Sequence, residues 1–299
     1  MKKVQLILRG VLLLLIFVGP AYTQHDPPTG VFELKSALLG RTVSYQVLYP
    51  VKYQSPENRE KRFPVLYLLH GVSGHSTDWL QKTKIALYAT HYDLFIVMVE
   101  GGNGWYTDSG TVPADKYESY ILRELIPEIE KDFRVSTQRE GRAIAGLSMG
   151  GYGSIKFGLK HPEMFAMAGS MSGAFGAASW TEKELNDPGV IRDSVLQTFG
   201  PADSPTRAAN DVPRLAREVS AKKIAPLPYF YIDCGTEDFL FSDSRELASL
   251  FVELKIPHEY RQLPGTHAWS YWDAQVQEIL KLAAQKLRGP EASVKSAAR

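Results

Sequence analysis

Short apolar segments alternate with amphipathic, helix-length segments through most of this 299-residue chain, and this alternation constrains its fold more than any other feature. Continuous apolar runs bounded by Gly or Pro are typical of parallel strands that are buried on both faces. Strands that alternate with helices through short connections form a parallel sheet covered by helices on both sides. We therefore predict a doubly wound α/β sheet. The expected strands are residues 63–70, 94–99, 142–147, 165–171, 228–234 and 258–263, and the expected helices are residues 79–89, 117–133, 153–160, 242–254 and 274–287.

An antiparallel pair of strands is expected before this alternating region, at residues 31–39 and 41–50. Apolar residues alternate with polar ones in the second segment, and Gly40 supplies the turn between the two segments. Residues 173–227 form the longest excursion, and an insertion after a central strand of such a sheet is expected over the carboxyl ends of the strands. The chain contains no internal repeat or long linker, so we predict one domain at residues 25–288, followed by a flexible tail at residues 289–299.

The first 24 residues differ from the rest of the chain. Lys2 and Lys3 precede an apolar run at residues 11–19, and small residues follow it, so residues 1–24 are predicted to be a secretory signal peptide. Cleavage is expected at residues 19–21, with Thr23 as a second choice. An apolar run of this length spans less than half of a hydrocarbon core of about 30 Å, which disfavours a stable membrane span. The mature protein is expected in the periplasm or outside the cell; an uncleaved anchor is the alternative.

Charge and cysteine content exclude several classes of function. Lys and Arg (34 residues) nearly balance Asp and Glu (33 residues), so the chain has no basic field for binding nucleic acid. Cys234 is the only cysteine, which excludes an intrachain disulfide and any zinc site with several cysteines. His70 and His75 lie in a Gly-rich loop with no carboxylate at ligand spacing. His70 is therefore interpreted as a brace for that loop, and no metal or organic cofactor is expected.

Ser148 is the predicted nucleophile, because it lies in the G-x-S-x-G motif of residues 146–150, between an expected strand and an expected helix. In this context the serine occupies a sharp turn that projects its hydroxyl group, and Gly146 and Gly150 leave room for the bend. The backbone N–H of Met149 would lie at a helix N-terminus, where it can stabilise an oxyanion. The motif alone would also fit an ordinary structural turn.

His267 and Asp238 are the predicted base and acid, since in this arrangement the acid and then the histidine follow the serine along the chain. His258 lies inside an expected strand, whereas His267 lies in the loop that leaves the carboxyl end of that strand. Three carboxylates compete for the acid. Asp233 is still within a strand, and Asp238 lies beyond the next turn and is preferred over its neighbour Glu237.

The second oxyanion donor is expected from the loop after the strand at residues 63–70. The backbone N–H of Val72 is preferred there, with that of Gly71 as the alternative.

Five motifs in order along the chain resemble the serine esterase family that includes esterase D (S-formylglutathione hydrolase), tributyrin esterase, the feruloyl and acetylxylan esterase modules and the antigen 85 mycolyltransferases. The resemblance extends from about Val31 to Leu287 and is closest to the tributyrin esterase branch. It implies an α/β-hydrolase fold without a lid domain or cofactor, a catalytic triad of Ser148, Asp238 and His267, and an oxyanion hole formed by the Val72 and Met149 amides. The motifs are LLHGV at 68–72 with Trp79, GNGWYTD at 102–108, GLSMGG at 146–151, CGTEDF at 234–239 and GTHAW at 265–269.

The resemblance leaves the substrate open. The signal peptide argues against the cytosolic S-formylglutathione hydrolase branch, and nothing in the chain resembles the trehalose sites of antigen 85. The expected function is an exported carboxylesterase for short acyl esters, acetyl or feruloyl esters among them, that are small molecules or linked to a polysaccharide. The alternatives are an acyltransferase of the antigen 85 type and an inactive carbohydrate-binding module. The expected substrate-binding residues are Gly71, Trp79, Trp105, Tyr106 and Trp269, although clustered aromatic residues of this kind, including Trp180 and Trp272, also suit ordinary packing.

Overall fold

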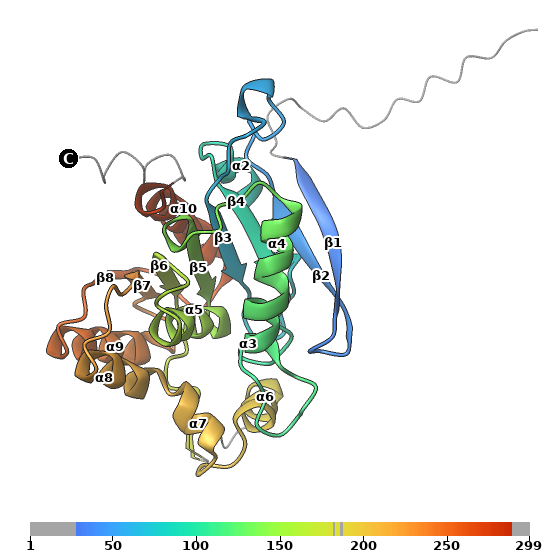
Figure 1. Cartoon of the computed structure of the whole chain (residues 1–299). Coiled ribbons are helices and arrows are strands. Elements are labelled where there is room, and N and C mark those ends of the chain that lie inside the picture. Colours follow the sequence, from blue (N-terminus) through green and yellow to red (C-terminus); the bar gives the residue numbers. More distant parts are fainter. Residues whose placement is uncertain (1–27, 182, 186–187, 289–299) are drawn as a thin grey trace, which may run out of the picture.

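A single eight-stranded sheet forms the centre of the protein (Figure 1). The computed structural model describes residues 28–181, 183–185 and 188–288; the predicted signal peptide and the predicted tail lie outside these residues. The strands follow the order β1-β2-β4-β3-β5-β6-β7-β8 across the sheet. Their bounds are β1 (Thr29–Ser36), β2 (Arg41–Leu48), β3 (Val65–Leu69), β4 (Phe95–Val99), β5 (Arg142–Leu147), β6 (Met167–Met171), β7 (Tyr229–Gly235) and β8 (His258–Leu263).

The pairing of the strands confirms the predicted doubly wound sheet. β1 pairs antiparallel with β2, and β2 pairs antiparallel with β4. All pairs from β4 through β3 to β8 are parallel, so the carboxyl ends of these strands meet at one edge. The loops that leave these ends therefore converge on the same place.

Two separate apolar cores lie on the two faces of the sheet, as the alternation of side chains along a strand requires. In β3, Val65, Tyr67 and Leu69 join one core, whereas Leu66 and Leu68 join the other. All five residues of this strand are buried. Central strands covered on both sides must be apolar throughout, which explains why their sequences are continuous apolar runs.

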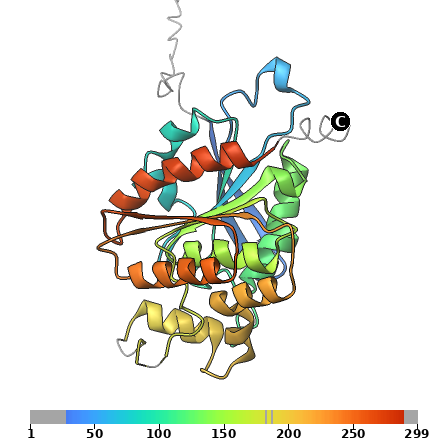
Figure 2. The same ribbon diagram turned by 90° about the vertical axis from the view of Figure 1, so that its left-hand side faces the viewer.

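Helices cover both faces of the sheet (Figure 2). α10, α1 and α2 lie on one face, and α3, α4, α5, α8 and α9 lie on the other. The helix bounds are α1 (Asp78–Lys82), α2 (Ile85–Ala89), α3 (Tyr117–Tyr120), a π-helical turn η2 (Ile121–Leu125), α4 (Ile126–Asp132), α5 (Met149–Lys160), α6 (Val190–Phe199), α7 (Pro205–Asn210), α8 (Val212–Ala221), α9 (Phe241–Glu253) and α10 (Trp269–Lys286), with short 3-10 helices η1 (Pro56–Asn58) and η3 (Arg139–Gly141).

One predicted helix is divided in two. The segment expected as a single helix at residues 79–89 forms α1 and α2, because Thr83 takes an extended conformation between them. The hydroxyl group of Thr83 donates to the Trp79 carbonyl oxygen, and the carboxylate of Asp273 in α10 accepts the Lys84 amide at 2.7 Å. A side chain that bonds its own backbone competes with the helical ladder and ends the helix.

The excursion at residues 173–227 lies over the carboxyl ends of the strands only in part. α6 and α7 lie beyond that edge of the sheet (Figure 1). α8 instead packs against α5 and α9 in the helical layer. Its buried residues Val212, Ala216 and Val219 form one apolar stripe, which must be covered by other helices. The prediction was therefore right for α6 and α7 and wrong for α8.

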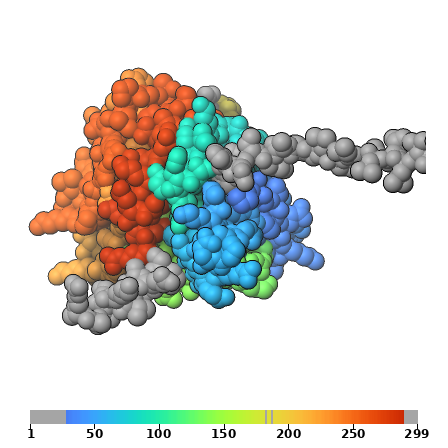
Figure 3. Space-filling view, turned by 90° about the horizontal axis from the view of Figure 1, so that it is seen from above, coloured from blue at the N-terminus to red at the C-terminus, as the bar shows by residue number. Residues whose placement is uncertain are grey.

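The end of the sheet at which the parallel strands begin is covered by elements other than those over their carboxyl ends. Figure 3 looks onto this end and shows the region around η1 between the β1–β2 pair and α10. The loops that carry the predicted site residues leave the opposite end of the sheet, near α6.

Candidate active site

Ser148 occupies a strained turn between β5 and α5. Its backbone has φ +53° and ψ −117°, a combination that side-chain-bearing residues rarely adopt. The Ser148 amide donates to the Met171 carbonyl oxygen at 3.0 Å, and the Ser148 carbonyl oxygen accepts from Tyr152 at 2.9 Å. The turn is thereby fixed on both sides, and strain that persists in this way is typical of a functional position.

The two glycines of the motif are required by close backbone contacts. A Cβ atom on Gly146 would lie 2.6 Å from the Gly150 carbonyl group. A Cβ atom on Gly150 would lie 2.6 Å from the Leu69 carbonyl oxygen and 2.7 Å from that of His70. Neither clash could be relieved by moving a flexible side chain, because the atoms belong to the backbone. These contacts confirm the reason given for the two glycines from the sequence.

The predicted acid, base and nucleophile form one hydrogen-bonded chain. Nε2 of His267 lies 3.0 Å from the Ser148 hydroxyl oxygen. Nδ1 of His267 lies 3.0 and 2.9 Å from the two carboxylate oxygens of Asp238. Because Asp238 can only accept when ionised, the ring proton is on Nδ1, and Nε2 is left as an acceptor for the serine proton. The Asp238 side chain is buried, whereas that of His267 is 18% exposed.

Two aromatic rings contact the imidazole of His267. Phe239 lies with its ring centroid 4.5 Å from that of His267, and Trp272 contacts His267 edge-to-face at 4.9 Å. The ring is thereby restricted in orientation as well as hydrogen-bonded, which favours a single geometry toward Ser148.

The carboxylate of Asp238 is kept ionised by its hydrogen-bond donors. Burial by itself raises the pKa of Asp238, but hydrogen bonds from the His267 ring and from the Leu240 amide, the latter 2.8 Å long, lower this pKa below its ordinary value. A charged acceptor is thus available to orient His267 and to stabilise its protonated form.

The two competing carboxylates are turned away from His267. One oxygen of the exposed Glu237 accepts the Gly265 amide at 2.6 Å, so Glu237 braces the loop that carries the histidine. Asp233 is a buried residue of β7 and accepts from the Tyr271 hydroxyl group at 2.9 Å. Of the three carboxylates weighed from the sequence, only Asp238 contacts His267.

The loop after β3 is fixed by His70. Nδ1 of His70 lies 2.7 Å from the Gly71 carbonyl oxygen, and the Gly101 amide donates to Nε2 at 3.0 Å. Since Nε2 accepts, the proton is on Nδ1, and the interpretation of His70 as a brace is confirmed. The Gly71 carbonyl belongs to the same planar peptide as the Val72 N–H, so this bond also orients the Val72 amide.

The two predicted oxyanion donors are free to bind a ligand. Within the described part of the chain, neither the Val72 nor the Met149 amide donates to a protein acceptor. Met149 is the first residue of α5, and the first amides of a helix have no partner inside it. The loop and the serine turn approach closely, since a Cβ atom on Gly71 would lie 3.3 Å from that of Ser148.

A pocket of about 330 Å³ opens over Ser148 and His267. Gly71, Trp105 and Trp269, three of the residues predicted to bind substrate, line it. Most of the lining is apolar, as in small-molecule sites, and a volume of this size lies near the lower end for such sites.

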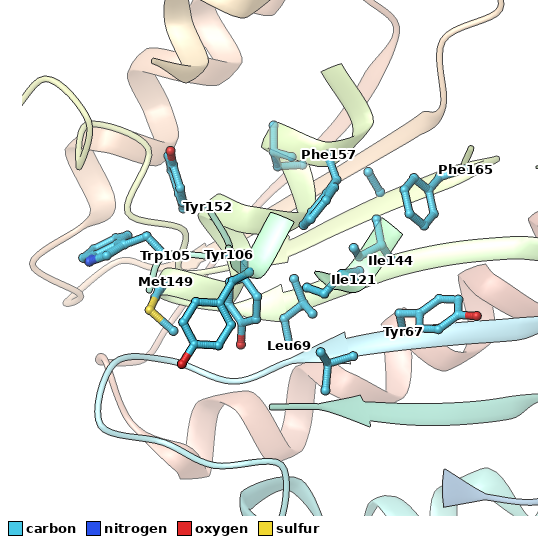
Figure 4. Packing of buried hydrophobic residues seen from close by; sticks show 14 of the residues in the cluster. Tyr67, Leu69, Trp105, Tyr106, Ile121, Ile144, Met149, Tyr152, Phe157 and Phe165 are labelled. Atoms are coloured by element: carbon cyan, nitrogen blue, oxygen red, sulfur yellow. The ribbon is translucent and has the colours of Figure 1, made fainter. Parts of the chain in front are cut away.

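Two of the predicted substrate-binding residues are behind the pocket wall. Trp79 is fully buried, donates to the Leu69 carbonyl oxygen at 3.3 Å and packs edge-to-face against Trp269. Tyr106 is fully buried, and its hydroxyl group donates to the His70 carbonyl oxygen at 2.9 Å. Figure 4 shows Tyr106 within the packed core, near Met149. Neither side chain lines the pocket, so the prediction was wrong for these two residues, which support the residues that do line it.

Several lining residues were not predicted. Asp78 and Lys82 of α1, Val190 and Ile191 of α6, and Phe239 also line the pocket. Asp78 and Lys82 are four residues apart, a spacing that places two side chains on one face of a helix. This signal was present in the sequence. Val190 and Ile191 lie in the long excursion, whose position relative to the sheet depends on tertiary packing.

Burial raises the pKa of the Cys234 thiol to about 12, so this side chain stays protonated at the end of β7.

Among the described residues, no helix is long and apolar enough to cross a membrane, and no group of three or more His, Cys, Asp or Glu side chains is placed to hold a metal ion.

Comparison with known proteins relates this geometry to a family. The family model described as Putative esterase matches residues 36–283. An acetyl esterase of Caldicellulosiruptor saccharolyticus is 26% identical over 248 residues, a match that covers 81% of this chain and 92% of the relative.

Solved structures show the same likeness. FphF, a fluorophosphonate-binding serine hydrolase of Staphylococcus aureus, superposes with a TM-score of 0.77 at 26% identity, covering 87% of this chain and 99% of FphF. A ferulic acid esterase superposes with a TM-score of 0.72 at 25% identity, covering 88% of this chain and 100% of the other. The chain therefore belongs to the esterase family whose model it matches, has the α/β-hydrolase fold and is a carboxylic ester hydrolase.

Proposed function

We propose that this protein is an exported serine carboxylesterase that hydrolyses short acyl esters through an acyl-enzyme intermediate on Ser148. The observation that carries the proposal is the hydrogen-bonded chain from Asp238 through His267 to the Ser148 hydroxyl group, below a small apolar pocket. A serine hydroxyl group is a weak nucleophile by itself and requires a neighbouring base that a third group orients. The three side chains supply that arrangement.

In the first step, Ser148 Oγ attacks the carbonyl carbon of the ester and transfers its proton to Nε2 of His267. The carbonyl oxygen becomes an oxyanion, which accepts from the free amides of Val72 and Met149. The bond to the alcohol oxygen then breaks, and that oxygen takes the proton from Nε2. The alcohol leaves, and the acyl group remains bonded to Ser148.

In the second step, a water molecule takes the place of the alcohol. His267 accepts one proton of this water while the oxygen attacks the acyl carbon, and the same two amides hold the new oxyanion. The bond to Ser148 Oγ breaks, and Oγ regains its proton from Nε2. The products are the carboxylic acid and the free enzyme, so protons and charges balance over the cycle.

The size of the pocket supports a small acyl group. A volume of about 330 Å³ accommodates a short aliphatic chain or a single aromatic ring, and its lining contains Trp105, Trp180 and Trp269. Relatives named acetyl esterase and ferulic acid esterase support acetyl and feruloyl groups as the first candidates.

Export is proposed from the first 24 residues alone, with their positive start, apolar run and small residues. Fractionation of cells that express the full chain tests this part. We expect a protein shortened at residues 19–24 in the periplasm or the medium. Full-length protein retained in the cytoplasm would contradict it.

Hydrolysis of p-nitrophenyl esters from acetate to decanoate, with methyl ferulate as an added substrate, tests the enzymatic part. Purified residues 25–299 should turn over the short esters, and Ser148→Ala should lower kcat by several orders of magnitude. Folded protein that hydrolyses none of these esters would refute the proposal. Transfer of the acyl group to an added alcohol in preference to water would identify an acyltransferase.

A further inference from the structure

The pocket over Ser148 has two chemically different ends. The charged side chains of Asp78 and Lys82, which form the charged end, come from α1, and α1 packs in the core on one face of the sheet. The apolar residues Val190 and Ile191, which form the apolar end together with Phe239, come from α6, and α6 packs against the core on the other face. An ester has two parts that must be placed on different sides of the serine, the acyl chain and the alcohol. The contrast between the two ends therefore bears on how the substrate is oriented.

The charged end offers hydrogen bonds and a ring face. The Lys82 ammonium group lies 3.0 Å from a carboxylate oxygen of Asp78 and 5.0 Å from the centroid of the Trp269 ring. The side chain of Asp78 is 7% exposed and that of Lys82 is 43% exposed, so the pair spans from the protein interior to solvent. A cation, a carboxylate and a ring face together suit a ligand group that carries several hydroxyl groups.

The residues of the apolar end keep a large part of their hydrophobic surface exposed in the part of the chain that the structure describes. Phe239 is 65% exposed, Val190 is 47% exposed and Ile191 is 42% exposed. In the described part of the chain nine large hydrophobic residues are exposed, and these three line the same pocket. Exposed apolar residues that gather at a concave site mark a place where an apolar ligand binds.

α6, which supplies Val190 and Ile191, is a fixed wall. The indole N–H of Trp105 donates to the hydroxyl group of Ser194 in α6 at 3.0 Å, and the Gly110 amide donates to the Thr198 carbonyl oxygen at 2.8 Å. The Trp105 ring also packs edge-to-face against Trp180 at 5.9 Å. Both tryptophans line the pocket, so the wall continues from the loop after β4 onto α6.

We propose that the end formed by Val190, Ile191 and Phe239 binds the acyl chain of the ester, and that the end formed by Asp78, Lys82 and Trp269 binds a hydroxyl-bearing alcohol. This inference rests on the proposed esterase function. An acyl chain beyond its carbonyl group is apolar and gains free energy by leaving water, whereas a polyhydroxylated alcohol would lose hydrogen bonds at the apolar end.

The two steps of the mechanism depend on different ends of the pocket, so kinetics can distinguish the ends. The acyl-enzyme has lost the alcohol but keeps the acyl chain, so its hydrolysis depends on the acyl end alone. Substitutions at Val190 and Ile191 should therefore change the rate of deacylation and the preference for chain length. A substitution at Lys82 should change acylation by esters of polar alcohols and leave deacylation unchanged.

The variants for the test are Val190→Ser with Ile191→Ser at the acyl end and Lys82→Met at the alcohol end. Leu196→Ser is the matched control, because Leu196 is also an exposed residue of α6 but does not line this pocket. Two substrate series separate the effects: p-nitrophenyl esters from acetate to octanoate, and acetyl esters of p-nitrophenol and of methyl glucoside. Burst kinetics give the deacylation rate, and steady-state kinetics give kcat/KM.

In the wild type, kcat/KM should rise about fourfold for each methylene group that contacts the apolar end, from a gain of about 0.8 kcal/mol per methylene group. In the variant with Val190→Ser and Ile191→Ser, kcat/KM should change little with chain length. In Leu196→Ser, kcat/KM should rise with chain length as in the wild type. Lys82→Met should lower kcat/KM for acetylated methyl glucoside by at least about tenfold, the effect of losing a hydrogen bond to a charged group. Its deacylation rate should equal that of the wild type.

The opposite pattern would overturn the inference: a changed chain-length series in Lys82→Met, or a changed alcohol preference with an intact series in the serine variant. Equal behaviour of all variants would overturn it as well. These outcomes differ from a failure of the proposed function, in which no burst appears and the wild type matches Ser148→Ala; the inference would then fall together with the function.

Discussion

Asp233 and Asp238 lie at the same end of β7 and are both buried, yet their pKa values are shifted in opposite directions. Burial raises the pKa of Asp233 to about 7, because the hydrogen bond from the Tyr271 hydroxyl group offsets only part of the cost of removing its charge from water. Burial acts on Asp238 in the same sense, but His267 and the Leu240 amide lower its pKa below the ordinary value.

The difference between the two carboxylates is the kind of donor that each one meets. Asp238 accepts from an imidazole that can become positively charged and from a backbone N–H in the following turn. Asp233 accepts from one neutral hydroxyl group, that of Tyr271, and its other oxygen has no hydrogen-bond partner among the described residues. Burial thus does not determine whether a carboxylate is charged; the donors around it do.

The largest expected effect is a difference in kcat between variants of the two carboxylates. Asp238→Asn should lower kcat by about 10⁴, because the amide no longer holds the His267 proton on Nδ1. Asp233→Asn should keep kcat within about threefold of the wild type. Steady-state hydrolysis of p-nitrophenyl acetate measures both. Comparable losses in the two variants would show that both carboxylates serve the reaction.

The second effect concerns stability and its dependence on pH. Unfolding lowers the pKa of Asp233 from about 7 to its ordinary 3.8. Between these values the folded state binds more protons, so the contribution of Asp233 to stability falls as pH rises toward 7 and is constant above that. The Asp233→Asn variant lacks this fall and should gain stability relative to the wild type by at most about 4 kcal/mol from pH 4 to pH 8.

Urea unfolding of the wild type and of Asp233→Asn at the two pH values measures this gain. Charged groups near Asp233 include Arg261 of β8 and Glu278 of α10, and they are common to both proteins. Their own titration therefore cancels in the difference. A stability difference that does not change with pH would contradict a raised pKa for Asp233.

A smaller effect is expected at the donor of Asp233. Tyr271→Phe removes the hydroxyl group that donates to this carboxylate at 2.9 Å. The loss of stability should be about 1 kcal/mol at pH 5, where Asp233 is neutral, and about 2 kcal/mol at pH 8, where the acceptor is charged.

The control for Tyr271→Phe is Tyr88→Phe. Tyr88 donates to the carboxylate of Asp273 at 3.2 Å, also on α10 but nearer to solvent. The loss of stability in Tyr88→Phe should be smaller than that in Tyr271→Phe at both pH values, since exposed pairs contribute little. An equal loss at the two sites would mean that burial does not strengthen the Tyr271 bond.

The smallest effect is expected at Glu237, the neighbour of Asp238. Glu237→Gln keeps an acceptor for the Gly265 amide, which bonds to Glu237 at 2.6 Å. We expect kcat and KM for p-nitrophenyl acetate within about twofold of the wild type. A loss as large as that of Asp238→Asn would assign the role of the acid to Glu237.

The sequence predicted the parts of the molecule that local rules determine. The bounds of β5 and β8 agree with the expected strands, because apolar runs and the turns beside them are local signals. The order of Ser148, Asp238 and His267 along the chain, together with their positions after the expected strands, selected three side chains that meet in space, since the carboxyl ends of parallel strands share one edge.

The pocket wall was less predictable because it depends on irregular backbone. Trp105 and Tyr106 are neighbours, both with positive φ values of 50° and 52°, and only Trp105 lines the pocket. No periodicity of a strand or helix applies to such a loop, so the direction of each side chain could not be read from its position. The placement of α6 likewise rests on distant contacts such as the bond from Trp105 to Ser194.

The most direct test of the mechanism is to isolate the acyl-enzyme. The protein is mixed with p-nitrophenyl acetate, quenched in acid within the burst and analysed by intact mass and peptide mapping. We predict the mass of one added acetyl group on the peptide that contains Ser148, its absence in Ser148→Ala and its slow formation in Asp238→Asn. An acetyl group on another residue, or hydrolysis without any adduct in the burst, would contradict Ser148 as the nucleophile.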